Sequence, residues 1–113
     1  MATQHQTPEM ALIERLYAVR GPAAVAAWLE AHPYLVPLLC EARDQIDAAF
    51  GPHTRVALEV IEDAEVEGWN QLCALVDLDD EARAIEGFRR LEQWWIEAMP
   101  IAADKLAILI DHR

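Results

Sequence analysis

Apolar residues recur at steps of three and four along residues 77–99, DLDDEARAIEGFRRLEQWWIEAM, and the positions between them are mostly polar or charged. This spacing puts the apolar side chains on one face of a helix with 3.6 residues per turn. The sequence therefore predicts one long amphipathic helix, which we expect to lie across a small β-sheet. The predicted buried stripe consists of Ile85, Phe88, Leu91, Trp95 and Met99.

The ends and interior of this helix carry further signals. Asp79 is the expected N-cap, because its carboxylate can accept hydrogen bonds from free N–H groups of the first turn. Pro100 is expected to end the helix, since proline lacks an N–H and restricts the residue before it. Glu86 and Arg90 stand four residues apart in the order that favours an ion pair. Gly87 costs about 1 kcal/mol relative to alanine in a helix interior, and it would permit close approach of a neighbouring element.

The first half of the chain shows the same period in three shorter segments. We expect one helix to begin at Pro8 and to end before Gly21, a second over Pro22–Ala31 and a third over Pro37–Phe50, because prolines and glycines mark these limits. The buried side chains would be Leu12, Ile13, Leu16, Tyr17, Val25, Trp28, Leu29, Leu38 or Leu39, Ala42, Ile46 and Phe50.

The period changes to two in the second half, which predicts strands at residues 54–62 and 71–78. A third strand is expected at 105–111, where the short run LAILI lies between Lys105 and Asp111. This last strand would pair either antiparallel beside the first strand or parallel beside the second. The antiparallel arrangement is the favoured interpretation.

The predicted order of elements is α-α-α-β-β-α-β, which indicates an α+β fold. Three short N-terminal helices would be followed by a β-β-α-β unit, and helices would cover a three-stranded, mainly antiparallel sheet. Residues 1–7 are expected to form a flexible tail, and residues 8–113 a single domain. The length of 113 residues and the hydrophobic content of 54 % are sufficient for one core.

The sequence predicts a cytoplasmic protein. No apolar run approaches the roughly 18 residues of a membrane span, and the opening MATQHQTPEM lacks the basic and apolar regions of a secretory signal. Cys40 and Cys73 lie far apart in apolar surroundings, which favours buried thiols in a reducing compartment over a disulfide.

Acidic residues dominate the charge of the chain. The formal net charge is −11, and the segment from Glu59 to Glu81 contains nine acids and no lysine or arginine. Binding of DNA or RNA through phosphate contacts needs clustered basic residues, so this class of function is excluded. A basic protein is the partner that such a charge favours.

Two features are candidates for a partner surface. The acidic connection Glu62, Asp63, Glu65 and Glu67 would face a basic partner or weakly hold a divalent cation, and the structural alternative is a solvated hairpin loop. Tryptophan is enriched at interface hot spots, which adds Trp69 and Trp94 to the candidates. The structural alternative for Trp94 is burial in the core beside Trp95.

No motif for catalysis, a metal or a cofactor stands out. The chain has no serine and no glycine-rich phosphate loop, and its four histidines lack zinc-site spacing. The aspartates from Asp77 resemble the opening of a calcium loop, but Ala82 and Phe88 occupy the positions that need glycine and glutamate. We therefore assign no catalytic, cofactor-binding or metal residue.

The layout resembles that of small uncharacterised bacterial proteins over residues 25–111. The segments that carry the resemblance are PYLVPLL at 33–39, the strand–loop–Trp69–strand region, WWIEA at 94–98 and KLAI at 105–108. The resemblance implies a bacterial cytoplasmic origin. It implies no site residues, because no activity is established for those proteins.

The leading hypothesis is a non-enzymatic acidic interaction protein that binds a basic protein partner. An antitoxin-like or inhibitor-like role is one version, in which the acidic surface covers a basic active or nucleic-acid-binding surface. The alternative is a small-ligand binder or enzyme with a pocket between sheet and helices, lined by Trp28, Trp69, Trp94 and Trp95. A homodimer through a sheet edge or the Trp94 face is compatible with either hypothesis.

Overall fold

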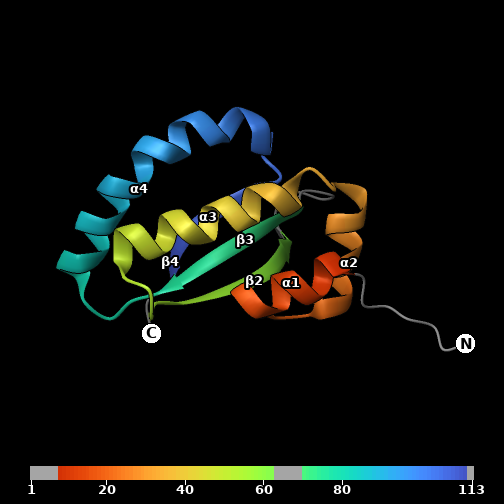
Figure 1. Cartoon of the computed structure of the whole chain (residues 1–113), viewed down its shortest axis with the longest axis horizontal. Helices are drawn as coiled ribbons and strands as arrows, with labels where there is room; N and C mark the ends of the chain where they lie inside the picture. Colours follow the sequence, from red (N-terminus) through yellow and green to blue (C-terminus); the bar gives the residue numbers. More distant parts are fainter. Residues whose placement is uncertain (1–7, 63–69, 112–113) are drawn as a thin grey trace, which may run out of the picture.

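The computed structural model describes residues 8–62 and 70–111. Within these residues, four helices and four strands form an α+β fold, as the sequence predicted, with three helices preceding a β-hairpin (Figure 1). The elements are α1 Pro8–Leu16, β1 Ala18–Val19, α2 Pro22–Ala31, α3 Leu35–Phe50, β2 Arg55–Glu62, β3 Asn70–Asp77, α4 Glu81–Ala102 and β4 Leu106–Asp111. The expected flexible tail, residues 1–7, lies outside the described residues.

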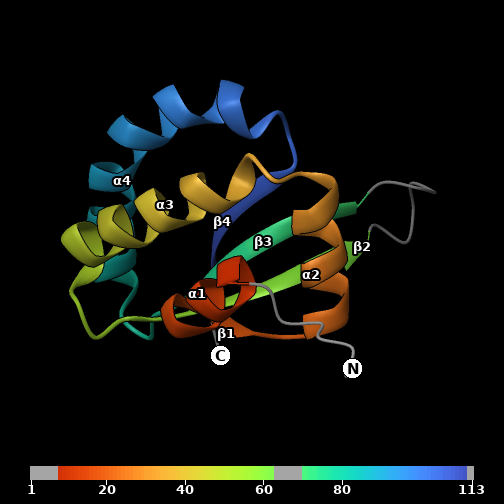
Figure 2. The same ribbon diagram turned by 45° about the vertical axis from the view of Figure 1, so that its right-hand side comes forward.

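The strands form one sheet in the order β1-β2-β3-β4, so β1 and β4 are its two edges (Figure 2). β2 and β3 make an antiparallel hairpin in which Val56 pairs with Val76. Both outer pairings are parallel: Ala18 of β1 is opposite Ala57 of β2, and β4 runs beside β3. The result is a mixed sheet with an antiparallel centre.

This sheet corrects the prediction of three mainly antiparallel strands. β1 has only two residues, which is too short for any period to appear in the sequence. β4 pairs parallel with β3, with Leu106 opposite Leu72, and does not pair antiparallel with β2. The physical reason is that β1 occupies the free edge of β2, while α4 returns the chain to the start of β4 in the manner of a β-α-β crossover.

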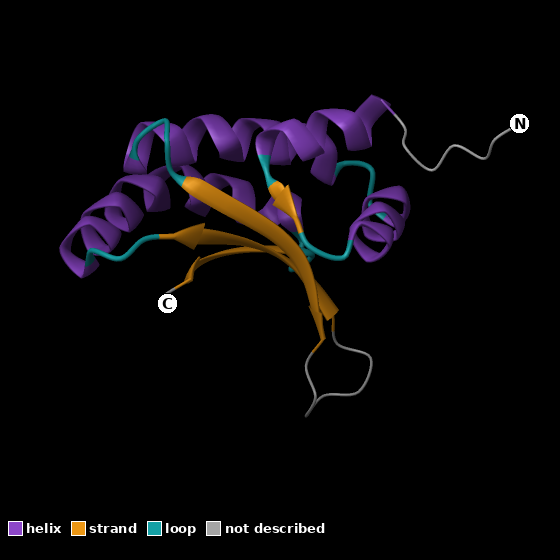
Figure 3. Ribbon diagram, turned by 90° about the horizontal axis from the view of Figure 1, so that it is seen from below, coloured by secondary structure: helices purple, strands orange, loops and turns teal. Residues whose placement is uncertain are grey.

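The helices lie on one side of the sheet (Figure 3). Alternate strand residues that point to this side are buried, among them Leu58, Ala74 and Ile108, and they are cross-strand neighbours in the register. On the other face, Ile61 and Leu109 are 39 % and 45 % exposed. The helix side of the sheet therefore carries most of the buried strand residues, and the other face is partly exposed.

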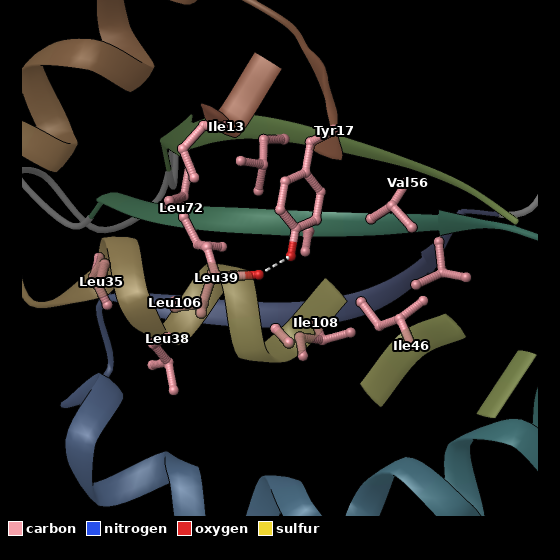
Figure 4. Packing of buried hydrophobic residues seen from close by; sticks show 14 of the residues in the cluster. Ile13, Tyr17, Leu35, Leu38, Leu39, Ile46, Val56, Leu72, Leu106 and Ile108 are labelled. Carbon is pink, nitrogen blue, oxygen red and sulfur yellow. Dashed lines mark hydrogen bonds between the residues drawn. The ribbon is translucent and has the colours of Figure 1, made fainter. Parts of the chain in front are cut away.

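The core fills the space between the helices and the sheet (Figure 4). Ile13 of α1, Ile46 of α3 and Leu72 of β3 are fully buried there. Tyr17, which directly follows α1, is buried as well, and its hydroxyl group donates a hydrogen bond of 2.6 Å to the carbonyl oxygen of Leu39. This bond satisfies a polar group that would otherwise destabilise the core.

α4 packs along α3 and arches over it (Figure 1). Its buried residues are Ala84, Gly87, Leu91, Ala98 and Ala102. Of the predicted stripe, Leu91 is buried and Phe88 and Trp95 are half-buried, whereas Ile85 and Met99 are 58 % and 50 % exposed. The buried face of α4 is thus rotated about the helix axis by about one residue position relative to the predicted face. The reason is that small residues on the observed face let α3 and α4 approach closely.

The ends of α4 also differ from the prediction. Asp80 is the N-cap, not Asp79, and its carboxylate accepts hydrogen bonds of 2.9 and 3.3 Å from first-turn N–H groups. Pro100 lies inside the helix, which continues to Ala102. Its missing N–H affects one hydrogen bond near the end, and the helix stops at Ala103, whose φ of 51° is left-handed.

The close approach expected at Gly87 is confirmed. A Cβ atom at this position would lie 2.1 Å from the nearest ring atom of Phe50 at the end of α3. The expected ion pair is also present, since Arg90 Nε lies 3.7 Å from Glu86 Oε1. Both side chains are more than 60 % exposed, so the pair adds little stability.

Candidate partner-binding groove

A groove of about 630 Å³ lies where α1, α2 and the start of α3 meet. Met10 and Leu29 form the deepest part of its wall, since they are only 6 % and 5 % exposed. Ala26 and Val36 are half-buried and extend the apolar surface. The lining is completed by Pro33, Pro37, Glu9 and Glu30.

The charged groups of the groove are both acids. Glu9 lies in the first turn of α1, where the helix dipole favours negative charge. Glu30 lies in the last turn of α2, and both side chains are exposed. Neither carboxylate makes an ion pair with a described residue, and no lysine or arginine lines the groove. The groove therefore combines an apolar wall with an anionic rim.

The sequence forms this groove by breaking the helical run at His32-Pro33. The axes of α2 and α3 are bent by 117° at this break. His32 stabilises the corner, because its Nδ1 lies 2.9 Å from the carbonyl oxygen of Trp28 and its ring centroid lies 4.7 Å from that of Trp28. Trp28 in turn donates a hydrogen bond of 3.1 Å from Nε1 to the carbonyl oxygen of Lys105, which ties α2 to the start of β4.

A second cavity, of about 350 Å³, lies where α3 ends and α4 begins. His53, Arg55 and Asp77 are among its lining residues, and two other polar side chains of its lining already bond within the protein. Arg83 and the Thr54 hydroxyl group both donate to the carbonyl oxygen of Phe50. These contacts hold the end of α3 against the start of α4, so we interpret this cavity as a structural junction.

The two thiols are poorly suited to nucleophilic catalysis. Burial raises the pKa of Cys73, and the nearby Glu59 raises it further. Burial and Asp44 likewise raise the pKa of Cys40. Since the thiolate is the reactive form, both shifts lower reactivity at neutral pH. Within residues 8–62 and 70–111, no group of three histidine, cysteine or acidic side chains is placed to hold a metal ion.

Of the residues singled out from the sequence as a partner surface, the structure describes Glu62 and Trp94, and these lie on different elements, β2 and α4. Glu62 lies exposed at the end of β2, and Asp63, Glu65, Glu67 and Trp69 lie outside the described residues. Trp94 is half-buried, and its Nε1 donates to Glu41 of α3. The cavities described above are not lined by Trp28, Trp94 or Trp95.

Sequence reasoning missed Glu9 and Glu30 as site residues. Each has the pattern of an ordinary helix-surface acid, and the packing of α1 on α3 together with the angle between α2 and α3 places the two beside one apolar surface. The signal in the sequence was limited to the break at His32-Pro33.

A scan against protein-family models, a search of curated proteins and a search of solved structures each gave no match. In the described part of the chain, no single helix is both long and apolar enough to cross a membrane, and only the sharply bent pair of α2 and α3 reaches that length and hydrophobicity together. What the protein does is therefore inferred from its own geometry.

Proposed function

We propose that this protein is a non-enzymatic acidic interaction protein whose groove binds a cationic, amphipathic segment of a partner protein. The observation that supports this most directly is the groove itself, with its apolar wall and its rim of Glu9 and Glu30. A segment with apolar side chains on one face and lysine or arginine beside them matches both properties.

The two parts of the groove would contribute differently. Contact of apolar side chains with Val36, Pro33 and Pro37, which line the groove and keep exposed area, supplies most of the affinity, because burial of apolar area is the main favourable term in association. The rim carboxylates and the net charge of −11 favour rapid association and reject anionic segments. Binding should therefore weaken as salt rises, since exposed ion pairs are screened.

Inhibition is the form of action that we favour for such a contact. A protein with a basic active surface or a basic nucleic-acid-binding surface would lose its function when that surface is covered. This is the antitoxin-like or inhibitor-like role suggested by the acidic composition.

A defined peptide tests the proposal without a known partner. The probe is a fluorescently labelled helical peptide of leucine and lysine with one apolar face, and its counterpart carries glutamate in place of lysine. The groove variant is Glu9→Lys with Glu30→Lys. The matched control is Glu81→Lys with Glu97→Lys, which makes the same charge change in the first turn and in the later part of α4.

We expect fluorescence anisotropy to show binding of the lysine peptide to the wild type and the control, and a loss of about tenfold or more in the groove variant. The glutamate peptide should not bind. Equal losses in the two variants would show a general charge effect and overturn the groove. Absence of binding by the wild type at low salt would overturn the proposed function.

A further inference from the structure

The outer edge of β4 is an unusual surface for a sheet edge. Among the strands that the structure describes, β4 has a hydrogen-bonded neighbour, β3, on one side only. Its residues 106–110 are all apolar and include no proline or charged residue. Natural edges are usually blunted by such residues or by bulges, because an open edge pairs readily with another strand.

The register of β3 with β4 shows which backbone groups are free at this edge. Leu72 is opposite Leu106, and the Leu72 N–H donates a hydrogen bond of 3.2 Å to the carbonyl oxygen of Lys105. In a parallel pair, residues that bond to the neighbour alternate with residues that point away from it. The N–H and C=O groups of residues 106, 108 and 110 therefore face outward.

We infer that two copies of this chain pair through their β4 edges, antiparallel, about a two-fold axis at Ile108. The two sheets then join into one sheet of eight described strands. In this register Lys105 of one copy faces Asp111 of the other, Leu106 faces Ile110, Ala107 faces Leu109 and Ile108 faces its own counterpart.

Three observations select this register. It pairs the outward backbone groups of residues 106, 108 and 110 in both copies. It puts Lys105, which makes no ion pair with a described residue, opposite Asp111, whose own contact is with Arg20 at 3.6 Å. Shifting the strands by two residues leaves both of these charges without an opposite charge. Shifting them by one places core-facing side chains on the open face.

The same arrangement provides a partner for an exposed apolar surface of α4. The helices of both copies lie on the same side of the joined sheet, because residues that are opposite each other in this register have side chains on the same face of the sheet. α4 lies on the β4 side of the molecule, away from α1 and β1 (Figures 1 and 2). Its Ile85, Ile96 and Met99 are 58 %, 62 % and 50 % exposed. A stable interface buries about 800 Å² per partner, more than a six-residue strand pair supplies, and α4 contributes the remainder.

This dimer is independent of the proposed function, since the groove lies among α1, α2 and α3 and shares no residue with the β4 edge. The two proposals can therefore fail separately. The Glu9→Lys, Glu30→Lys variant should dimerise like the wild type.

Light scattering on the full chain gives the first test, because a dimer has about twice the monomer mass of 12.7 kDa. We expect Lys105→Glu to raise the dimer dissociation constant by about tenfold or more, since it puts two acids opposite each other at both ends of the strand pair. The matched control is Arg15→Glu, the same charge reversal on α1, which should leave the dissociation constant unchanged. The dimer is overturned if the wild type is a monomer at about 100 μM, and the register is overturned if both variants behave alike.

Disulfide cross-linking tests the register directly. Cys40 and Cys73 are first replaced by alanine, and Ala107→Cys and Leu109→Cys chains are then prepared separately. Mild oxidation of the mixture should give a covalent dimer of one chain of each kind, while either chain alone should give much less. Preferential cross-linking of Leu109→Cys chains to each other would overturn this register. So would a mixture that stays uncross-linked while the chain with only Cys40→Ala and Cys73→Ala still forms a dimer in light scattering.

Discussion

Replacing Gly87 by alanine offers a test in which two physical effects have opposite signs. In an open helix interior, alanine is favoured over glycine by about 1 kcal/mol. At Gly87 the added Cβ would lie 2.1 Å from the nearest Phe50 ring atom. Carbon atoms in ordinary contact are about 3.5–4.0 Å apart, so the ring would have to move by more than about 1 Å.

The Phe50 ring has little room for such a movement. It is only 4 % exposed, and it contacts the Phe88 ring edge-on at a centroid distance of 6.0 Å. Overpacking of a core costs about 1–3 kcal/mol, and an overlap this large belongs in the upper half of that range. Subtracting the gain in helix propensity, we expect Gly87→Ala to lower the free energy of unfolding by about 1–2 kcal/mol.

Urea denaturation followed by tryptophan fluorescence and circular dichroism measures this change, at one fixed protein concentration because association affects apparent stability. Gln93→Gly against Gln93→Ala, at an exposed site of α4, calibrates the effect of propensity alone. Phe50→Leu completes a double-mutant cycle: it should cost about 1 kcal/mol or more in the wild type and clearly less beside Ala at position 87. Stabilisation by Gly87→Ala equal to that at position 93 would refute the close contact.

Two further predictions concern a helix cap and a buried phenol. Asp80→Ala should lower the free energy of unfolding by about 1 kcal/mol, whereas Asp79→Ala should change it little; equal effects in urea denaturation would contradict the observed cap. Burial raises the pKa of Tyr17, so as pH rises the Tyr17 hydroxyl group loses its proton in the unfolded chain before it does so in the folded chain. The contribution of the protonated hydroxyl group to the free energy of unfolding is therefore complete below a pH of about 10. Above that pH it falls by at most about 1.4 kcal/mol per pH unit. Tyr17→Phe should remove this part of the alkaline decline, and a decline that is unchanged in Tyr17→Phe would disprove the assignment.

Much of the secondary structure could be predicted from the sequence because its signals are local. Pro22 and the glycine at position 51 mark helix limits through backbone conformation, and the alternation around Val56 marks a strand through side-chain orientation. These signals depend on a few neighbouring residues. The positions of the helices, of the hairpin and of β4 therefore followed from the pattern alone.

The remaining features depend on contacts between distant residues. Two adjacent faces of α4 could pack against α3: one carries large apolar side chains such as Ile85, and the other carries small residues such as Gly87. The position of Phe50 on α3 decides which of these faces is buried. The partner of β4 was equally undetermined, because two residues after α1 occupy the edge of β2. The groove could not be predicted for the same reason, since Glu9 and Glu30 line it through the packing of α1 on α3 and the angle between α2 and α3 at His32-Pro33.

The mixed sheet has a consequence for the order in which the chain assembles. β2 and β3 are neighbours in sequence, whereas Ala18 of β1 and Ala57 of β2 are 39 residues apart, and Leu72 of β3 and Leu106 of β4 are 34 residues apart. Closing such distances loses chain entropy before any contact compensates for it, so the central hairpin can form early and the two outer strands must add later. We therefore expect the folding rate to be set by the addition of β1 and β4 to a β2–β3 hairpin that has already formed.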